Sequence, residues 1–580
     1  MLKTLFSLSL ILLFYLKPMA INYSVSFDKV KSHYVTVDLN LETKGEQFID
    51  FKVPVWTPGS YKVREFSNAF ENVKANGCKI ERVNKNTWRI HNKGVKNVAI
   101  SYDVYCFTVS VRQSYADAKY AYLHGVSAFG YIEGYMNDEI VLSIKPNNGW
   151  KNVEVALPQI KAQGFVFRCA NYDLLADSPI AIGNFDVAKY SSGNVPHKIV
   201  MIGEGNYNLD IVTEDFKKIS DQQVKLMGDH PSSQYLHFVY NVESGGGGLE
   251  HLNSQCSMIN RWAYTNDKKY KSFLGLIAHE YFHLWNVKRI RPAELGPFDY
   301  DKENYTEMLW IAEGITSYYD DMTLYRLGYY NTEEYLKIIA KQINRFENTP
   351  GKNVMNLAES SKLAWVKSYM PKEESYNTEI SYYNKGMIAA LLLDLEIRQT
   401  DSKSLDDVMR MLYTDYYKAG NKGFTHQQFV EVCNKVADRD LNAFFEDVIY
   451  STKALNYYDI FSKYGINVKD KNSEACRAWS GVKSKVGGGK VTITSIAANS
   501  PAIDAGLSVN DEIIGLNDWR LKDNVENHDK HFSVNHKVNI VYCRDGKIFS
   551  TDLEYQKSPV MDFELEIEDA ENKRLKAWID

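Results

Sequence analysis

Two histidines four residues apart, with a glutamate beside the first, are the residues of this chain that point most directly to chemistry. They stand in the helix-compatible run Leu276-Ile-Ala-His279-Glu280-Tyr-Phe-His283. Side chains at i and i+4 share one helical face, about 5–6 Å apart at Cβ, so both imidazoles could bind one metal ion. Glu280 would then contact a metal-bound water without binding the ion, as in zinc peptidases. The motif predicts a metal site on a helix.

The third protein ligand is expected from another helix, because a catalytic zinc ion has three protein ligands and one open position. Glu313 is the candidate, since its neighbours Ala312 and Gly314 are small enough for a carboxylate to approach a metal closely. The alternative, a solvent-facing Glu313, fits poorly with the apolar residues around it. Either Ser317 or Asp320 is a candidate to orient a metal-binding histidine, and the sequence leaves both open.

Two further segments carry candidate substrate contacts. A run of four glycines ends at Gly247 and Gly248, just before Glu250, and glycines let a strand edge approach a peptide closely. Glu250 could hold a cationic amine there; a flexible linker is the alternative. Tyr383 precedes a predicted helix and could stabilise an oxyanion, although one Tyr among 40 is more often a packing residue.

Length and charge limit the class of protein. A chain of 580 residues is too long for one core, so three or more domains are expected. The net charge of −5 argues against nucleic acid as a partner. Seven scattered cysteines form no C-x-x-C pair, which disfavours thiolate zinc sites and thioredoxin-like chemistry.

The N-terminus has the pattern of a secretory signal peptide. Lys3 supplies a positive charge, and the apolar run that follows is short for a membrane span. We therefore expect residues 1–20 to be removed and the protein to be periplasmic or secreted, with no transmembrane segment in the mature chain. An uncleaved membrane anchor is the alternative.

Hydrophobic periodicity divides the rest of the chain. Alternating apolar runs separated by turn residues predict an antiparallel β domain over residues 21–195. A mixed β/α-helical catalytic domain is expected over residues 196–465, with residues 559–580 as an acidic, solvated tail. The predicted helices are Lys271–Val287, Thr306–Leu327, Asn384–Gln399, Leu405–Lys418 and His426–Val436.

Residues 470–558 resemble a PDZ domain. The resemblance is carried by the Ser500-Pro-Ala, Ala505-Gly-Leu and Asp511-Glu-Ile-Ile segments. Trp479-Ser480-Gly481-Val482 falls where such domains keep their carboxylate-binding loop, whose N–H groups could hold a peptide C-terminus beside a strand edge. Peptide C-termini are thus an expected second partner.

Taken together, these motifs resemble the glycyl aminopeptidases that carry a C-terminal PDZ domain, relatives of the thermolysin-like gluzincin zinc metallopeptidases. The segments that carry the resemblance are Trp56-Thr-Pro-Gly-Ser-Tyr61, Gly247-Gly-Leu-Glu-His251, His279–Pro292, Ala312–Tyr319 and the PDZ core. The resemblance implies a multidomain α+β fold: an N-terminal antiparallel β domain, a thermolysin-like mixed β/α-helical catalytic domain and a C-terminal PDZ domain.

The resemblance also implies the roles of the site residues. His279, His283 and Glu313 would bind one Zn²⁺ per chain, and Glu280 would be the catalytic carboxylate. Glu250 would bind the free amino group of a peptide substrate, and Tyr383 would stabilise the transition state. One departure is that Glu313 follows His283 by 30 residues, so residues 288–304 must loop out.

The leading hypothesis is a zinc-dependent aminopeptidase acting on peptides with N-terminal Gly or Ala, a preference that comes wholly from the resemblance. A PDZ-assisted zinc endopeptidase is a second hypothesis. A catalytically silent peptide-binding protein is a third, disfavoured by the intact set of metal ligands and by Glu280.

Overall fold

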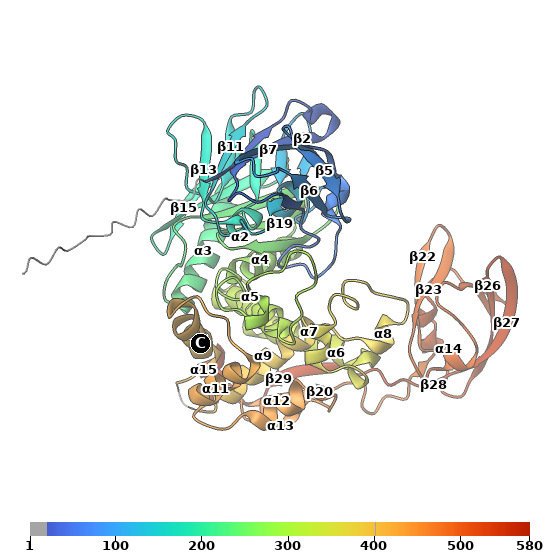
Figure 1. Ribbon diagram of the computed structural model, residues 1–580. Coiled ribbons are helices and arrows are strands. Elements are labelled where there is room, and N and C mark those ends of the chain that lie inside the picture. The colour runs from blue at the N-terminus through green and yellow to red at the C-terminus, as the bar shows by residue number, and fades with distance from the viewer. Residues whose placement is uncertain (1–19, 401, 580) are drawn as a thin grey trace, which may run out of the picture. The chain divides into compact units, whose positions relative to one another are not determined.

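The computed structural model describes residues 20–400 and 402–579 (Figure 1). The expected signal peptide therefore lies, apart from its last residue, outside the described residues. The chain forms two compact units. One comprises the described residues up to Val55 together with Glu65–Asn184, and the other comprises Trp56–Arg64 and Phe185 onward. None of the helices in the described ranges combines the length and apolar character that a membrane crossing requires.

The first unit is the N-terminal β domain, built from three sheets. Period-two alternation explains its largest sheet, because Val35, Val37 and Leu39 of one strand are fully buried while the residues between them are not. That sheet has the order β13-β11-β1-β2-β7-β4. Its strands are β1 (Ile21–Ser26), β2 (Tyr34–Glu42), β4 (Phe70–Ala75), β7 (Asn97–Tyr105), β11 (Ile140–Lys145) and β13 (Phe165–Cys169). The smaller sheets have the orders β10-β3-β6-β5 and β12-β14-β9-β8. Their strands are β3 (Ile49–Lys52), β5 (Lys79–Arg82), β6 (Thr87–His91), β8 (Tyr115–Ala116), β9 (Ala121–Leu123), β10 (Tyr131–Ile132), β12 (Asn152–Val155) and β14 (Ile180–Gly183).

The second unit begins with a five-stranded sheet of order β15-β16-β17-β19-β18. Its strands are β15 (Asp186–Ser192), β16 (Val195–Ile202), β17 (Tyr235–Val242), β18 (Gly247–His251) and β19 (Ser254–Asn260). Helices α3 (Leu209–Met227) and α4 (Asp267–Phe282) share an apolar cluster with it, in which Phe216, Val239 and Ile277 are fully buried. Because the glycine-rich strand β18 is last in the strand order, it forms an edge of the sheet, where an extended peptide could pair with it.

The helical part of this unit holds the second half of the site. The predicted helix over residues 306–327 starts later than expected, as the π-helical turn η4 (Trp310–Gly314) followed by α5 (Ile315–Arg326). Helix α9 (Asn384–Ile397) is buried along almost its whole length and packs against both. Gly314 and Gly386 make this crossing close, since a Cβ on Gly314 would lie 2.5 Å from the backbone of Gly386.

Other helices surround this centre: α6 (Thr332–Glu347), α10 (Leu405–Leu412), α11 (His426–Ala437), α12 (Asn442–Val448) and α13 (Tyr457–Ser462). The predicted helix over residues 405–418 is observed as α10 and a further π-helical turn, η6 (Tyr413–Lys418). Residues 288–304 form the expected long connection, which is irregular except for the short 3₁₀ turn η3 (Ala293–Leu295).

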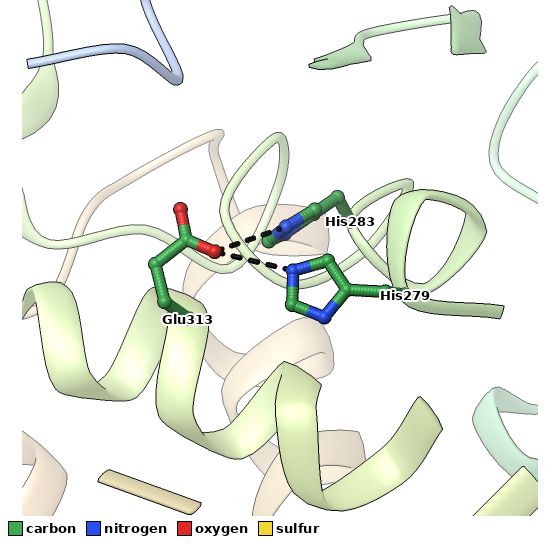
Figure 2. Close-up of side chains that lie close together, drawn as sticks. All are labelled: His279, His283 and Glu313. Carbon is green, nitrogen blue, oxygen red and sulfur yellow. Dashed lines mark hydrogen bonds and ion pairs between the residues drawn. The ribbon is translucent and has the colours of Figure 1, made fainter. Parts of the chain in front are cut away.

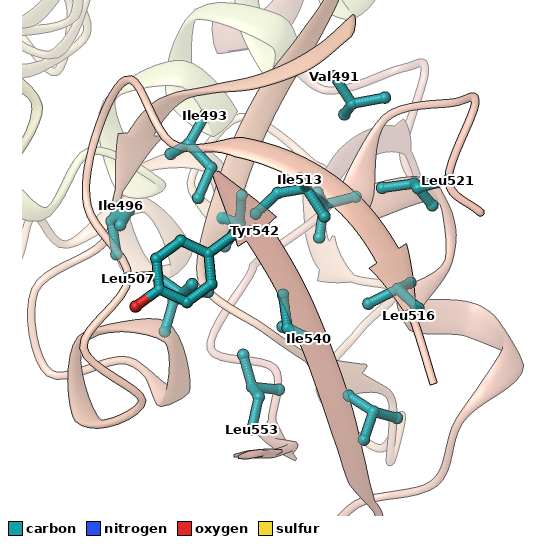
Figure 3. Close-up of a cluster of buried hydrophobic side chains, with 14 of the residues drawn as sticks. Val491, Ile493, Ile496, Leu507, Ile513, Leu516, Leu521, Ile540, Tyr542 and Leu553 are labelled. Carbon is teal, nitrogen blue, oxygen red and sulfur yellow. The ribbon is translucent and has the colours of Figure 1, made fainter. Parts of the chain in front are cut away.

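The PDZ domain is a β sheet of order β22-β23-β24-β26-β27 around its own core (Figure 3). The strands are β22 (Val482–Gly487), β23 (Lys490–Ile496), β24 (Glu512–Leu516), β26 (Lys537–Arg544) and β27 (Lys547–Glu554). Ile493, Ile540 and Leu553 are almost completely buried at its centre.

The expectation of a solvated tail over residues 559–580 is wrong. Strand β29 (Phe563–Ile567) pairs antiparallel with β20 (Ile466–Asp470), and helix α15 (Lys573–Ile579) follows. Trp578 is 2% exposed and its Nε1–H donates to the Tyr318 hydroxyl at 3.1 Å. The segment is acidic overall, but apolar side chains between its charges are buried and pack the tail against the catalytic helices.

Candidate active site

Helix α4 presents the two histidines on one face, as their spacing predicts. Asn266 caps the start of this helix by accepting from the backbone N–H of Lys269, and His283 stands at its C-terminal end. The imidazole centroids of His279 and His283 lie 4.8 Å apart. Both rings can therefore serve one ion.

The orientation of each imidazole is fixed through its Nδ1 atom. Nδ1 of His279 lies 2.9 Å from Asp320 Oδ2, and Nδ1 of His283 lies 2.7 Å from the carbonyl oxygen of Asn286. A donating Nδ1–H leaves Nε2 of each ring free to bind a metal. Of the two candidates for orienting a histidine, Asp320 makes this contact. The role of the Asn286 carbonyl has no signal in the sequence.

Glu313 completes the cluster from the π-helical turn η4. Its Oε2 lies 3.3 Å from Nε2 of His279 and 3.4 Å from Nε2 of His283 (Figure 2). Asn286 ties the two halves together, because its side-chain amide donates to the backbone carbonyls of Ile311 and Ala312 at 2.8 and 3.2 Å. A π-turn at this point is a feature often found at functional sites.

The donor set fits a divalent metal ion. The ligand atoms of His279, His283 and Glu313 all lie within 4.8 Å of one another, and all three residues are enclosed by the protein. Burial opposes ionisation of Glu313, but the two histidines outweigh it and lower the pKa of its carboxyl to about 2. A buried carboxylate facing two imidazole nitrogens is the His₂Glu set of catalytic zinc sites.

Glu280 lies beside this set on helix α4, and its carboxylate packs against Gly248 of the edge strand β18. Burial, opposed by the two histidines, raises the pKa of its carboxyl to about 7. Its Oε2 is buried and has no hydrogen-bond partner among the described residues, as expected for an atom that faces a reactant. Gly248 of β18 leaves room for it, since a Cβ there would lie 2.2 Å from Glu280 Oε1. Only glycine fits beside this carboxylate.

Glu250 lies on the same strand and is 4% exposed. Its carboxylate and ligand atoms of Glu280 and His283 fall within 4.8 Å of one another. A residue that sequence reasoning did not assign to the site, Gly59, packs directly against it: a Cβ on Gly59 would lie 2.5 Å from Glu250 Oε1. The signal for it was the Trp56-Thr-Pro-Gly-Ser-Tyr61 segment, which groups with the catalytic unit although it is flanked by strands of the N-terminal domain.

Tyr383 approaches the metal ligands from the start of α9. Its ring stacks on that of His279 with centroids 6.2 Å apart and planes 26° from parallel. Burial, reinforced by the Glu313 carboxylate, raises the pKa of the Tyr383 phenol well above its usual value. The phenol therefore keeps its proton at neutral pH and can act as a hydrogen-bond donor.

A cavity of about 820 Å³ lies between α4, α5, α6 and α9. Its wall includes Tyr383, Asp320 and Leu276, but neither the two histidines nor Glu313. Neither Glu250 nor Gly59 lines it.

Comparison with known proteins assigns the segments that form this site to a protein family. The M61 glycyl aminopeptidase model matches residues 272–389, which include both histidines, Glu313 and Tyr383. The model of the M61 N-terminal domain matches residues 22–184, and a PDZ model matches residues 463–554. The chain belongs to the M61 glycyl aminopeptidase family. It is accordingly a zinc metallopeptidase of the aminopeptidase type, with an N-terminal β domain, a helical catalytic domain and a PDZ domain.

Several solved structures resemble the chain to different extents. An aminopeptidase N family protein from Idiomarina loihiensis superposes with a TM-score of 0.90 at 28% identity, covering 97% of this chain and 100% of that one. An M1 zinc metallopeptidase from Deinococcus radiodurans gives a TM-score of 0.46 at 11% identity, covering 75% of this chain and 94% of its own. Aminopeptidase A from Legionella pneumophila gives 0.47 at 12% identity, covering 74% and 48% of the two chains. No curated protein matches the sequence.

Proposed function

We propose that this M61 family member removes single small residues, glycine or alanine, from the N-termini of peptides, using one zinc ion held by His279, His283 and Glu313. When bound, such an ion supplies Lewis-acid polarisation of the oxygen atoms that react there. Glu280 accepts a proton from the attacking water and passes it to the leaving amine. A general base works best with a pKa near the working pH, and burial places that of Glu280 at about 7.

Substrate binding follows from the edge strand. The peptide pairs with β18, and its free ammonium group binds the Glu250 carboxylate. Gly59 packs so closely against that carboxylate that a Cβ would not fit between them, and we expect this crowding to exclude chain beyond the ammonium group and to favour a small first side chain. The rest of the peptide leaves through the 820 Å³ cavity, which is within the usual size range for ligand pockets.

Tyr383 donates a hydrogen bond from its phenol to the oxyanion that develops at the scissile carbonyl. A prearranged donor of this kind contributes on the order of 10²–10³-fold in rate. Its adjacent residue Tyr382 is 1% exposed and provides a packing control. Tyr383→Phe should lower the rate of peptide hydrolysis, whereas Tyr382→Phe should leave that rate unchanged.

The observation that carries the proposal is the close packing of the buried Glu250 carboxylate against Gly59. It is tested with Glu250→Gln, which keeps the shape of the side chain and removes its charge. We expect KM for a free-amine Gly-peptide to rise at least tenfold, while metal content stays at one ion per chain. Equal cleavage of the free-amine and the N-acetylated peptide by the wild type, or an unchanged KM in Glu250→Gln, would reject the amine-binding role.

A further inference from the structure

Two carboxylates of the PDZ domain accept hydrogen bonds from backbone N–H groups that a bound peptide would be expected to use. The fold itself does not require these contacts. Domains of this type take a C-terminal carboxylate on backbone N–H groups of a loop and pair the peptide main chain with the adjacent strand edge. Here the loop is Trp479–Val482, and β22 is an edge strand of the sheet.

Donors of Ser480 and Val482 in this loop are already engaged. The backbone N–H and the hydroxyl of Ser480 both donate to Asp529 Oδ2 at 3.1 Å. The backbone N–H of Val482 donates to the Ser480 hydroxyl at 3.3 Å. Ser480 is completely buried and Asp529 is 8% exposed. One carboxylate oxygen of Asp529 thus accepts from Ser480 in the loop where the carboxylate of a peptide is expected.

The strand edge next to the loop is covered in the same way. The backbone N–H of Ser484, on β22, donates to both carboxylate oxygens of Glu526 at 3.2 and 3.1 Å. The Ser484 hydroxyl also donates to Glu526 Oε2 at 2.7 Å, and it accepts from the backbone N–H of Val525 at 2.8 Å. Glu526 and Asp529 belong to one segment, the consecutive 3₁₀ turns η7 (Val525–Asn527) and η8 (Asp529–His531).

We propose that the segment Val525–His531 is an internal ligand of the PDZ domain, with Asp529 in the carboxylate loop and Glu526 on the strand edge. The domain then takes an external peptide C-terminus only when this segment moves away. An incoming carboxylate would otherwise meet two carboxylates of like charge and find no free donor at Ser480 or Ser484. The expected capture of peptide C-termini is therefore latent, and it competes with the chain's own side chains.

The test uses the full-length chain and a pool of fluorescent peptides whose last four residues are randomised. One pool ends in a free carboxylate and the other in an amide. The double variant Glu526→Ala/Asp529→Ala is compared with the wild type, and Glu554→Ala, an exposed carboxylate of the same domain, is the control. We expect at least tenfold tighter binding of the free-acid pool by the double variant alone, with no gain for the amide pool.

Hydrogen–deuterium exchange over residues 478–486 gives a second measurement that needs no peptide. Protection of this stretch should fall in the double variant and stay at the wild-type level in the control. A wild type that binds the free-acid pool as tightly as the double variant overturns the proposal. A folded double variant with unchanged protection overturns it as well. Peptidase activity is not part of either readout, so the result stands apart from the proposed catalytic role.

Discussion

Gly59 lies so close to Glu250 that a single methyl group could not be placed between them: a Cβ on Gly59 would be 2.5 Å from Glu250 Oε1. The φ angle of Gly59 is +81°, a backbone conformation that residues with side chains rarely adopt. Both facts make glycine necessary at this position, which packs against the proposed amine-binding carboxylate. The specificity for free N-termini is therefore expected to depend on a residue outside the catalytic sequence motifs.

Gly59→Ala should lower kcat/KM for a free-amine Gly-peptide by more than tenfold, because the new Cβ must push Glu250 or the loop out of place. The measurement is steady-state kinetics with metal content determined in parallel. Gly134→Ala is the matched control, since Gly134 has φ of +82° but open space around its Cβ. If both variants lose activity equally, backbone strain and not the contact with Glu250 is the cause.

Gly248→Ala should reduce kcat on the order of 100-fold, within the range expected when a general base is lost or misplaced. The new methyl group would lie 2.2 Å from Glu280 Oε1 and displace that carboxylate. Gly246→Ala in the same glycine run meets nothing within 4 Å and should keep its rate. Equal rates for the two variants would show that β18 does not hold Glu280 in place.

The sequence was sufficient to bring the two candidate histidine ligands together, because the i, i+4 spacing alone puts His279 and His283 on one face. The fold class was also within reach, since strand-like alternation gives way to helical periodicity near residue 270 and the PDZ motif segments follow. Other features depend on packing that no local pattern encodes. The π-turn at Glu313 lies where Gly314 crosses Gly386. Gly59 lies beside Glu250 because its segment packs with the catalytic unit, although strands of the N-terminal domain flank that segment in the sequence.

Asp320→Ala should weaken metal binding by roughly 10–100-fold, the usual effect of removing a group that orients a ligating histidine. Nδ1 of His279 then loses its partner at 2.9 Å. Asp320→Asn keeps an oxygen acceptor and should lose less. Chelator competition measures the metal affinity directly. Ser317→Ala serves as control, and a larger loss there than in Asp320→Ala would reassign the orienting role.

The stability of the PDZ domain should fall as pH rises from about 4 to about 6. Burial, opposed by hydrogen bonds from Ser480, raises the pKa of Asp529 from 3.8 to about 6, with the nearby Glu526 carboxylate adding to the rise. The folded state thus holds a proton that the unfolded chain releases at lower pH, and the loss is on the order of 3 kcal/mol. Thermal unfolding followed between pH 4 and 7 measures it.

Asp529→Asn removes the titrating group and should flatten that pH dependence of the PDZ transition. The other titratable side chains that influence Asp529 are Glu526 and Tyr555, so Glu526→Gln is measured beside it. A pH profile that is unchanged in Asp529→Asn and flattened in Glu526→Gln would assign the effect to Glu526 instead.

The central claim, a zinc aminopeptidase closed beyond the substrate amine, is tested most directly by mass spectrometry of one peptide time course. The substrate is a Gly-Ala-initiated peptide of about ten residues, presented with a free and with an acetylated N-terminus to wild type and to Glu280→Gln. We predict that wild type releases residues one at a time from the free N-terminus only, and that Glu280→Gln releases almost none while holding one metal ion per chain. Internal cleavage, or equal cleavage of the acetylated peptide, would contradict the account.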